Sequence, residues 1–291
     1  MPEAERRLDF RDMTESDLAD GLRLSRASGW NQTLEDWRLL LSLGPGLFRV
    51  ATRDGRVVAS GGAVRYGQAL AWVCMILVHP DERGHGLGTR VFDEVLARCA
   101  DEVAAGRLRC VGLDATPAGR GIYAQRGFLD GPELLRMSGQ SQGMETAPDG
   151  VRRLAPSDLE GVLARDLRVF GADRGPVLRW ARERAPERAW IARAGGGPAG
   201  YCFGRRGDHS DHVGPLVAED GATALELVQA CQAQPRRRPL VLDARAEPAW
   251  IERLGELGFR AARPFTRMYL GKARPAALPA LEPVVLGPEF G

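Results

Sequence analysis

The stretch RGHGLGT at residues 83–89 has the composition of a loop that binds an anion through its main chain. Three alternating glycines follow an arginine, between an apolar run at 69–78 and a segment whose apolar residues recur at helical spacing. Glycines let a backbone approach a ligand closely, and the exposed amides at the start of a helix carry partial positive charge. The pattern therefore predicts a phosphate or diphosphate as the ligand.

Two other phosphate-binding patterns do not fit this loop. A Walker loop requires Gly-Lys-Ser/Thr, but Gly88 is followed directly by Thr89. A dinucleotide-binding fingerprint requires G-x-G-x-x-G, but the third glycine comes one residue too early. From the loop alone two interpretations stay open: a phosphate site, or a glycine-rich turn that only joins a strand to a helix.

The segment VHPDERGHGLGT at 78–89 resembles the acyl-CoA-binding motif of the GNAT superfamily of N-acetyltransferases. The family motif is Arg/Gln-x-x-Gly-x-Gly/Ala after a strand that ends in Val-x-Pro. The resemblance implies that the strand end holds the pantetheine arm of acetyl-CoA and that the loop amides hold its diphosphate. The implied cofactor-binding residues are Leu77, Val78, Arg83, Gly84, His85, Gly86, Leu87, Gly88 and Thr89.

A second motif, IYAQRGF at 122–128, resembles the Tyr-x-x-x-Gly-Phe of the same family. The family tyrosine commonly acts as general acid toward the departing thiolate, which implies that role for Tyr123. The alternative is an aromatic side chain that only packs over the sheet. The strings GWNQTLEDW, LDATPAGRGIY and RPFTRM also resemble a two-domain branch of the family with an atypical carboxy-terminal half.

The general base is not visible in the sequence. The apolar run at 69–78 has no carboxylate where the family often has a glutamate. We therefore expect a water chain, with Asp114 or His79 as its possible ends, although Asp114 equally suits a helix cap and His79 a surface position. Cys74 is interpreted as a core residue, since the sequence places no histidine beside it to make it a nucleophile.

The acceptor pocket is expected to include Trp30, Asn31, Asp114 and Thr116. Trp30 and Asn31 form an unusual pair in the loop SGWNQT, and loops commonly carry binding residues. The other interpretation of Trp30 is a side chain that covers the edge of the core.

These motifs lie in a chain that repeats its own pattern. CVGLDATPAGRGIYAQRGF near position 110 and LVLDARAEPAWIERLGELGF near position 240 both indicate strand, Asp, short helix and Gly-Phe. A hairpin signature and a capped helix precede each copy. We expect an α+β fold of two tandem GNAT-like domains, each a twisted mixed β-sheet flanked by helices.

The expected boundaries follow from composition. Residues 1–138 form the acetyl-CoA-binding catalytic domain, 150–272 a degenerate GNAT-like domain, and 273–291 a Pro-rich tail. The segment between the two domains, GQSQGMETAPDG at 139–150, has little to bury and is interpreted as a linker.

The second half lacks both motifs. At the place of the glycine loop it has VAEDGAT at 217–223, whose two carboxylates would repel a diphosphate, and Leu254 stands where the first half has Tyr123. We therefore expect one acyl-CoA site per chain, with the second half as a wall of the acceptor pocket. Its polar candidates are Tyr201, His209, Asp211 and His212.

Composition narrows the possible partners. Forty basic and 38 acidic side chains give a net charge of +2, which disfavours nucleic acid as a partner. Five cysteines without a C-x-x-C pair favour a reducing compartment and no zinc site. The amino terminus shows no signal segment and the longest apolar run is too short to cross a bilayer, so we expect a cytoplasmic monomer or homodimer without metal.

Together these features predict an acyl-CoA-dependent N-acetyltransferase that moves acetyl from acetyl-CoA to a primary amine of a small molecule or peptide by direct attack. The alternative is a non-catalytic acyl-CoA sensor or partner-interaction module, which the missing carboxylate base supports. The sequence does not name the acceptor, the acyl-chain preference or the oligomeric state.

Overall fold

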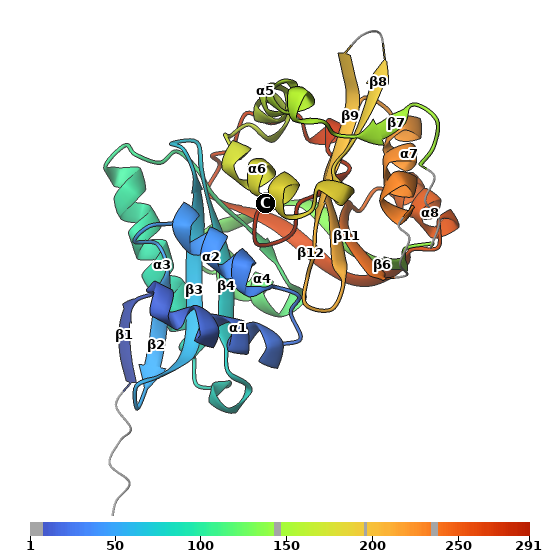
Figure 1. Cartoon of the computed structure of the whole chain (residues 1–291). Coiled ribbons are helices and arrows are strands. Elements are labelled where there is room, and N and C mark those ends of the chain that lie inside the picture. Colours follow the sequence, from blue (N-terminus) through green and yellow to red (C-terminus); the bar gives the residue numbers. More distant parts are fainter. Residues whose placement is uncertain (1–7, 143–146, 195–196, 234–237) are drawn as a thin grey trace, which may run out of the picture. The chain divides into compact units, whose positions relative to one another are not determined.

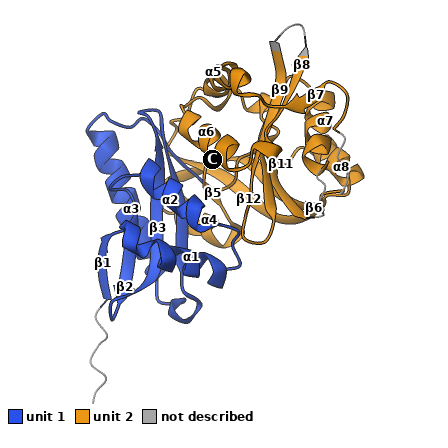
Figure 2. Ribbon diagram, viewed as in Figure 1, with its two compact units in different colours: residues 1–113 blue, residues 114–291 orange. Residues whose placement is uncertain are grey.

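The computed structural model describes residues 8–142, 147–194, 197–233 and 238–291. The chain divides into two compact units, Met1–Leu113 and Asp114–Gly291 (Figure 2). Strands and helices are mixed along both units, as Figure 1 shows, which confirms the α+β class.

The first unit contains a sheet with the strand order β1-β2-β3-β4-β5, in which β4 and β5 are parallel and the other neighbours antiparallel. Its strands are β1 (Leu8–Asp12), β2 (Arg49–Arg53), β3 (Arg56–Tyr66), β4 (Leu70–Val78) and β5 (Val111–Ala115), the last of which ends in the second unit. Its helices are α1 (Leu18–Ala27), α2 (Leu34–Leu43) and α3 (Leu87–Ala104).

The two faces of this sheet are covered by different elements. A Cβ added at Gly61 would lie 2.7 Å from Val91 of α3, whereas one at its neighbour Gly62 would lie 2.2 Å from Phe48. Successive strand residues point to opposite faces, so α3 packs on one face and the segment after α2 on the other. The expected apolar stripe of α3 is buried at Val91, Phe92, Val95 and Cys99.

The second unit contains strands in the order β12-β6-β11-β13-β10-β9-β8-β7. These strands are β6 (Phe128–Gln140), β7 (Val151–Arg153), β8 (Trp190–Ala194), β9 (Gly197–Arg205), β10 (Asp211–Ala218), β11 (Pro239–Arg245), β12 (Arg260–Leu270) and β13 (Val284–Val285). The helices are α4 (Pro117–Ala124), α5 (Leu159–Phe170), α6 (Gly175–Arg184), α7 (Gly221–Gln232) and α8 (Pro248–Glu256).

The order of elements confirms the internal repeat. The sequence β1-α1-α2-β2-β3-β4-α3-β5-α4-β6 is followed by β7-α5-α6-β8-β9-β10-α7-β11-α8-β12. The compact units nevertheless divide at Leu113, earlier than the expected linker at 139–150. The physical reason is that β6 pairs with both β12 and β11, through Leu134 with Phe265 and Met137 with Leu242.

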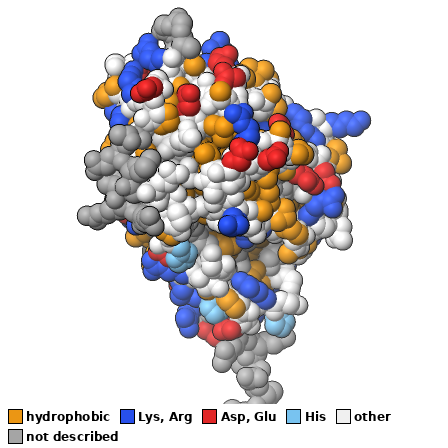
Figure 3. Space-filling model, turned by 90° about the vertical axis from the view of Figure 1, so that its right-hand side faces the viewer, with side chains coloured by type: hydrophobic (Ala, Val, Ile, Leu, Met, Phe, Trp, Pro, Cys, Tyr) orange, Lys and Arg blue, Asp and Glu red, His pale blue; other side chains and the backbone are white. Residues whose placement is uncertain are grey.

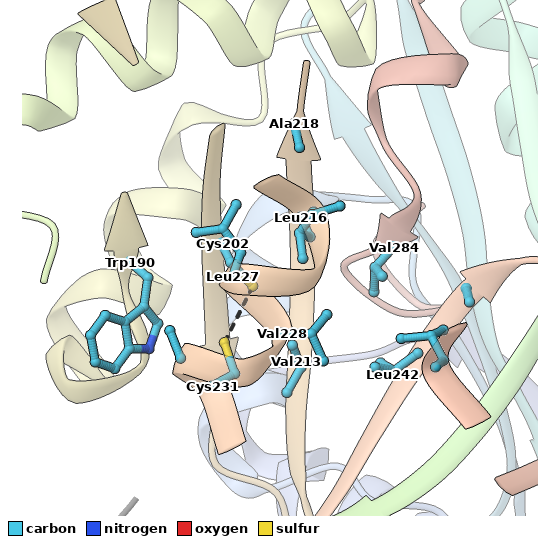
Figure 4. Close-up of a cluster of buried hydrophobic side chains, with 14 of the residues drawn as sticks. Trp190, Cys202, Val213, Leu216, Ala218, Leu227, Val228, Cys231, Leu242 and Val284 are labelled. Carbon is cyan, nitrogen blue, oxygen red and sulfur yellow. Dashed lines mark hydrogen bonds between the residues drawn. The ribbon is translucent and has the colours of Figure 1, made fainter. Parts of the chain in front are cut away.

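The carboxy-terminal residues belong to the core of the second unit. The segment expected as a tail, 273–291, contributes β13, which lies in the sheet between β11 and β10. Val284, Val285 and Phe290 have no exposed surface. Figure 4 shows Val284 beside Leu216 and Leu242 in this core.

All five cysteines are buried thiols. Figure 4 shows two of them, Cys202 of β9 and Cys231 of α7, whose sulfur atoms are 3.5 Å apart. Burial raises the pKa of Cys202 well above its usual range, so this thiol stays neutral. On the face shown in Figure 3 basic and acidic side chains are interspersed, in keeping with the small net charge.

Candidate active site

The glycine loop needs glycine for two reasons. Gly84 and Gly86 have φ values of +83° and +72°, a region that other residues rarely adopt. A Cβ added at either position finds no atom of the described chain within 4 Å, so the space beside the loop is open. Residues 83–86 are exposed, while Leu87 is buried and fixes the loop to the core. The backbone of the loop is thus presented to a ligand.

Helix α3 begins at this loop with an unusual N-terminus. Its N-cap is Gly86, which has no side chain to accept a hydrogen bond from the first turn. The first amides of a helix have no partner within it, and they carry about half a positive elementary charge together. Leu87, Gly88 and Thr89 therefore offer main-chain N–H groups for an anion.

Arg83 braces the loop from within the same unit. Its Nε donates to the carbonyl of Val78 at 3.2 Å, and its terminal nitrogen donates to the hydroxyl of Ser28 at 3.1 Å. The guanidinium thus ties the end of β4 and Ser28 to the loop.

Strand β4 is distorted at Met75, which the sequence analysis missed. Met75 has φ +57°, its carbonyl accepts from the Ser60 hydroxyl at 3.0 Å, and the register with β3 shifts beside it. In the described part of this unit, the ladder between β4 and β5 consists of Ala71–Val111 and Trp72–Gly112 and does not continue toward Val78. A methionine gives no sequence signal for such a bulge.

Tyr123 lies on α4, a helix of the second unit. Thr116 is the N-cap of α4 and accepts from the amide of Gly119 at 3.3 Å. The Tyr123 ring tilts against Phe128 at a centroid distance of 6.3 Å. Burial raises the pKa of Tyr123 to about 12, so the phenol keeps its proton at neutral pH.

Asp114 is held by a partner that the sequence analysis did not foresee. Its carboxylate accepts two hydrogen bonds of 2.9 Å from Arg267 of β12, and both side chains are buried. Burial disfavours the charge of Arg267, but the carboxylate outweighs it and raises the pKa of Arg267 above its usual range. Asp114 is thus a structural ion-pair partner within the second unit.

The remaining expected residues are divided between the units. Trp30 and Asn31 lie in the loop between α1 and α2 of the first unit, and both are partly exposed. His79 is partly exposed at the end of β4, with its Nδ1 3.6 Å from a carboxylate oxygen of Asp81. Thr116 and Tyr123 belong to the second unit.

The corresponding helix start in the second repeat is acidic. Asp220 is the N-cap of α7 and accepts from the amide of Thr223 at 2.8 Å. That hydrogen bond holds the pKa of Asp220 below its usual range, so the position is negative. Glu219 pairs with Arg165 at 2.7 Å. A carboxylate therefore occupies the place that an anionic ligand would need.

Three of the four polar candidates from the second half are buried, so the expectation that they line an open pocket is wrong for them. Tyr201 donates to Asp166 at 2.7 Å, and Asp211 pairs with Arg188. His212 is 1% exposed, and burial lowers its pKa well below its usual range. Only His209 among the four is exposed. Polar residue type alone does not distinguish a pocket wall from a buried ion-pair network.

Comparison with known proteins identifies the family. Residues 11–128 match the family described as "Acetyltransferase (GNAT) family", and residues 162–278 match one described as "Acetyltransferase (GNAT) domain". The chain belongs to the GNAT superfamily. It carries one GNAT domain in each half, as the internal repeat predicts, and is an acyl-CoA-dependent acyltransferase.

Proteins similar to this GNAT protein match it over most of its length. It is 27% identical to a holothin acyltransferase of Pseudoalteromonas sp. (strain SANK 73390) over 248 residues, 84% of this chain and 82% of the relative. A putative acetyltransferase of Pyrococcus horikoshii superposes with a TM-score of 0.78 at 21% identity, covering 99% and 97% of the two chains. A tandem GNAT protein of the clavulanic acid biosynthesis pathway reaches 0.60 at 18% identity, covering 90% and 98%.

In the part of the chain that the structure describes, no group of three or more His, Cys, Asp or Glu side chains is placed to hold a metal ion. Among the helices of the described ranges, none has both the length and the apolar character needed to span a bilayer.

Proposed function

We propose that this protein is an N-acetyltransferase that transfers acetyl from acetyl-CoA to a primary amine of a small molecule or peptide by direct attack. The observation that carries the proposal is the exposed glycine loop at the start of α3, with two positive-φ glycines and no side-chain cap. The family uses acetyl-CoA as cosubstrate, and its thioester supplies an activated acyl group to the acceptor.

The residues of the first unit fit this cosubstrate. The loop suits the diphosphate, because residues 83–86 are exposed and the first amides of α3, at Leu87, Gly88 and Thr89, provide a positive local field. The end of β4 at Leu77 and Val78 suits the pantetheine arm, since the ladder with β5 stops before it in the described unit. His85 lies exposed within the same loop.

Tyr123 is proposed as the general acid. A departing thiolate needs a proton, and a positioned donor contributes about 10²- to 10⁴-fold to such a step. The raised pKa keeps the phenol protonated at neutral pH, which is the form that donates.

The acceptor amine must instead lose a proton before it can attack the thioester. An amine with a pKa of about 10.4 costs roughly 4 to 5 kcal/mol to deprotonate at neutral pH. Asp114 is occupied by Arg267, which leaves His79, partly exposed at the end of β4, as the better candidate for the end of a water chain. Trp30 and Asn31 remain candidates for the acceptor pocket.

The relative named for acylating holothin supports acyl transfer as the reaction. The rival function, an acyl-CoA sensor without an acceptor, draws on the absence of a carboxylate along β4. An assay of thiol release from acetyl-CoA against pooled amines, antibiotics, polyamines and peptide amino termini separates the two. An enzyme releases free thiol with at least one pool, whereas a sensor raises its Tm with acetyl-CoA and releases none.

Gly86→Ala tests the glycine loop. The new Cβ would enter the ligand space from a left-handed backbone, so we expect the Kd for acetyl-CoA to rise about tenfold or more. Displacing one charge-assisted hydrogen bond is worth about 1.5 to 3 kcal/mol, and 1.4 kcal/mol is tenfold. Isothermal titration calorimetry measures the change.

Gly106→Ala is the matched control for this variant. Gly106 follows the other end of α3, has φ +69°, and finds no described atom within 4 Å of an added Cβ. It therefore carries similar backbone strain without approaching the loop. Equal losses of affinity in the two variants would show that strain, and not ligand contact, explains the effect.

A further inference from the structure

Helix α4 contains two glycines, Gly119 and Gly121, although glycine is a weak helix former and α4 has only eight residues. Neither lies in the left-handed region of φ, so the backbone conformation does not require them. The two differ in their surroundings. A Cβ added at Gly121 finds no atom of the described chain within 4 Å, whereas one at Gly119 meets Tyr123.

The contact at Gly119 is with the reactive end of the tyrosine. An added Cβ would lie 2.9 Å from Cε2 of Tyr123, and 3.3 Å from both its Cζ and its hydroxyl oxygen. Residues four apart share one face of a helix, and side chains lean toward the helix N-terminus. The ring therefore folds back over Gly119 and lies closer to its backbone than any side chain there would allow.

We propose that Gly119 is a positioning residue for Tyr123. Because Gly119 has no side chain, the phenol ring can occupy the space beside its backbone, and this sets the position of the hydroxyl group. This inference rests on the proposed function, in which that hydroxyl donates the proton to the departing thiolate. The Tyr123 ring also lies near Phe128, whose side chain is 2% exposed. The centroids of the two rings are 6.3 Å apart. Gly119 and Phe128 thus both lie against the ring.

A capping role does not explain the glycine. The amide of Gly119 donates to the carbonyl of Thr116 at 3.0 Å and approaches its hydroxyl oxygen at 3.3 Å. In both bonds Gly119 contributes only its main-chain N–H group, which every residue except proline provides. The requirement for glycine at this position therefore comes from the space that the Tyr123 ring occupies.

The test compares Gly119→Ala with Gly121→Ala. Both add one methyl group to the same helix and bring the same gain of helix propensity. We expect Gly119→Ala to lower kcat about tenfold or more, because a displacement of about 1 Å at a reacting group can cost about 10²-fold. The KM for acetyl-CoA should stay within about twofold, and Gly121→Ala should leave kcat and KM within about twofold of the wild type.

A spectroscopic readout on the protein without substrates accompanies the kinetics. The chain has four tyrosines, so labelling tyrosine Cζ with carbon-13 gives four signals, and the one lost in Tyr123→Phe belongs to Tyr123. Gly119→Ala should shift that signal, whereas Gly121→Ala should not. A signal unmoved by Gly119→Ala, or equal kcat in the two alanine variants, overturns the inference.

The failure of the proposed function would look different. If Tyr123→Phe leaves kcat unchanged, the acid assignment fails and the inference falls with it. If Tyr123→Phe lowers kcat while Gly119→Ala behaves like Gly121→Ala, the acid assignment stands and only the positioning role is overturned. In the Tyr123→Phe background Gly119→Ala should have little further effect on kcat, because the ring at position 123 then has no hydroxyl proton to donate.

Discussion

Replacing Tyr123 by phenylalanine is expected to lower kcat well over tenfold, toward the range of about 10² to 10⁴ that a general acid supplies. The change removes one oxygen from a side chain whose ring packs against Phe128, so the fold and the KM for acetyl-CoA should change little. Steady-state kinetics of thiol release, with both substrates varied, measure the effect. Loss of affinity without loss of kcat would contradict the role.

The pH dependence sharpens this prediction. Burial raises the pKa of Tyr123 to about 12, so the donating, protonated form persists at all pH values below that. The wild-type kcat should therefore not fall between about pH 7 and pH 10 through loss of the acid, and it should rise where the acceptor amine loses its proton. A fall of kcat in this pH range that disappears in Tyr123→Phe would show that the phenol ionises below about pH 10 and would contradict the prediction.

Tyr66→Phe provides the control. Tyr66 ends β3 in the first unit and is buried, so the change removes a phenol hydroxyl from elsewhere in the chain. We expect its kcat to stay within about twofold of the wild type. A comparable loss in both variants would indicate a general effect of removing a buried hydroxyl, which is worth about 0.5 to 1.5 kcal/mol.

Glu282→Gln is expected to lower the free energy of unfolding by about 3 to 5 kcal/mol. Glu282 is 2% exposed, and its carboxylate pairs with Arg174 at 2.7 Å and with Arg245 at 3.2 Å. Glutamine has the same shape but no charge, so buried guanidinium charge is left less compensated. Urea unfolding followed by circular dichroism measures the change.

The control is Glu252→Gln, an exposed glutamate on α8 of the same unit. Its free energy of unfolding should stay within about 0.5 kcal/mol of the wild type. The structure shows the segment before β13 packed in the core. An equally small effect of Glu282→Gln would contradict that packing. This prediction separates a packed carboxy terminus from a loosely attached tail.

The local features of this protein were determined by its sequence. The loop at 83–89, the buried strand before it and the apolar stripe of α3 depend on residues that are neighbours in the chain, and the structure places them as expected. The tandem repeat was visible for the same reason, because each copy has its own strand, helix and Gly-Phe signals. The comparisons confirm a GNAT domain in each half.

The long-range features were decided only by the tertiary structure. Arg267 reaches Asp114 from 153 residues away, and the pairing of β6 with β11 and β12 moves the boundary between compact units to Leu113. The bulge at Met75 has no sequence signal of its own.

The physical reason is that burial and ion pairing depend on which surfaces meet after folding. A charged residue has the same letter whether it is solvated or paired in the core, and a short apolar segment such as that at 284–286 is a loose end or a strand depending on the gap it fills. Sequence periodicity describes only neighbours along one element. The burial of the charged residues and of the segment at 284–286 therefore depends on the tertiary structure of the second unit.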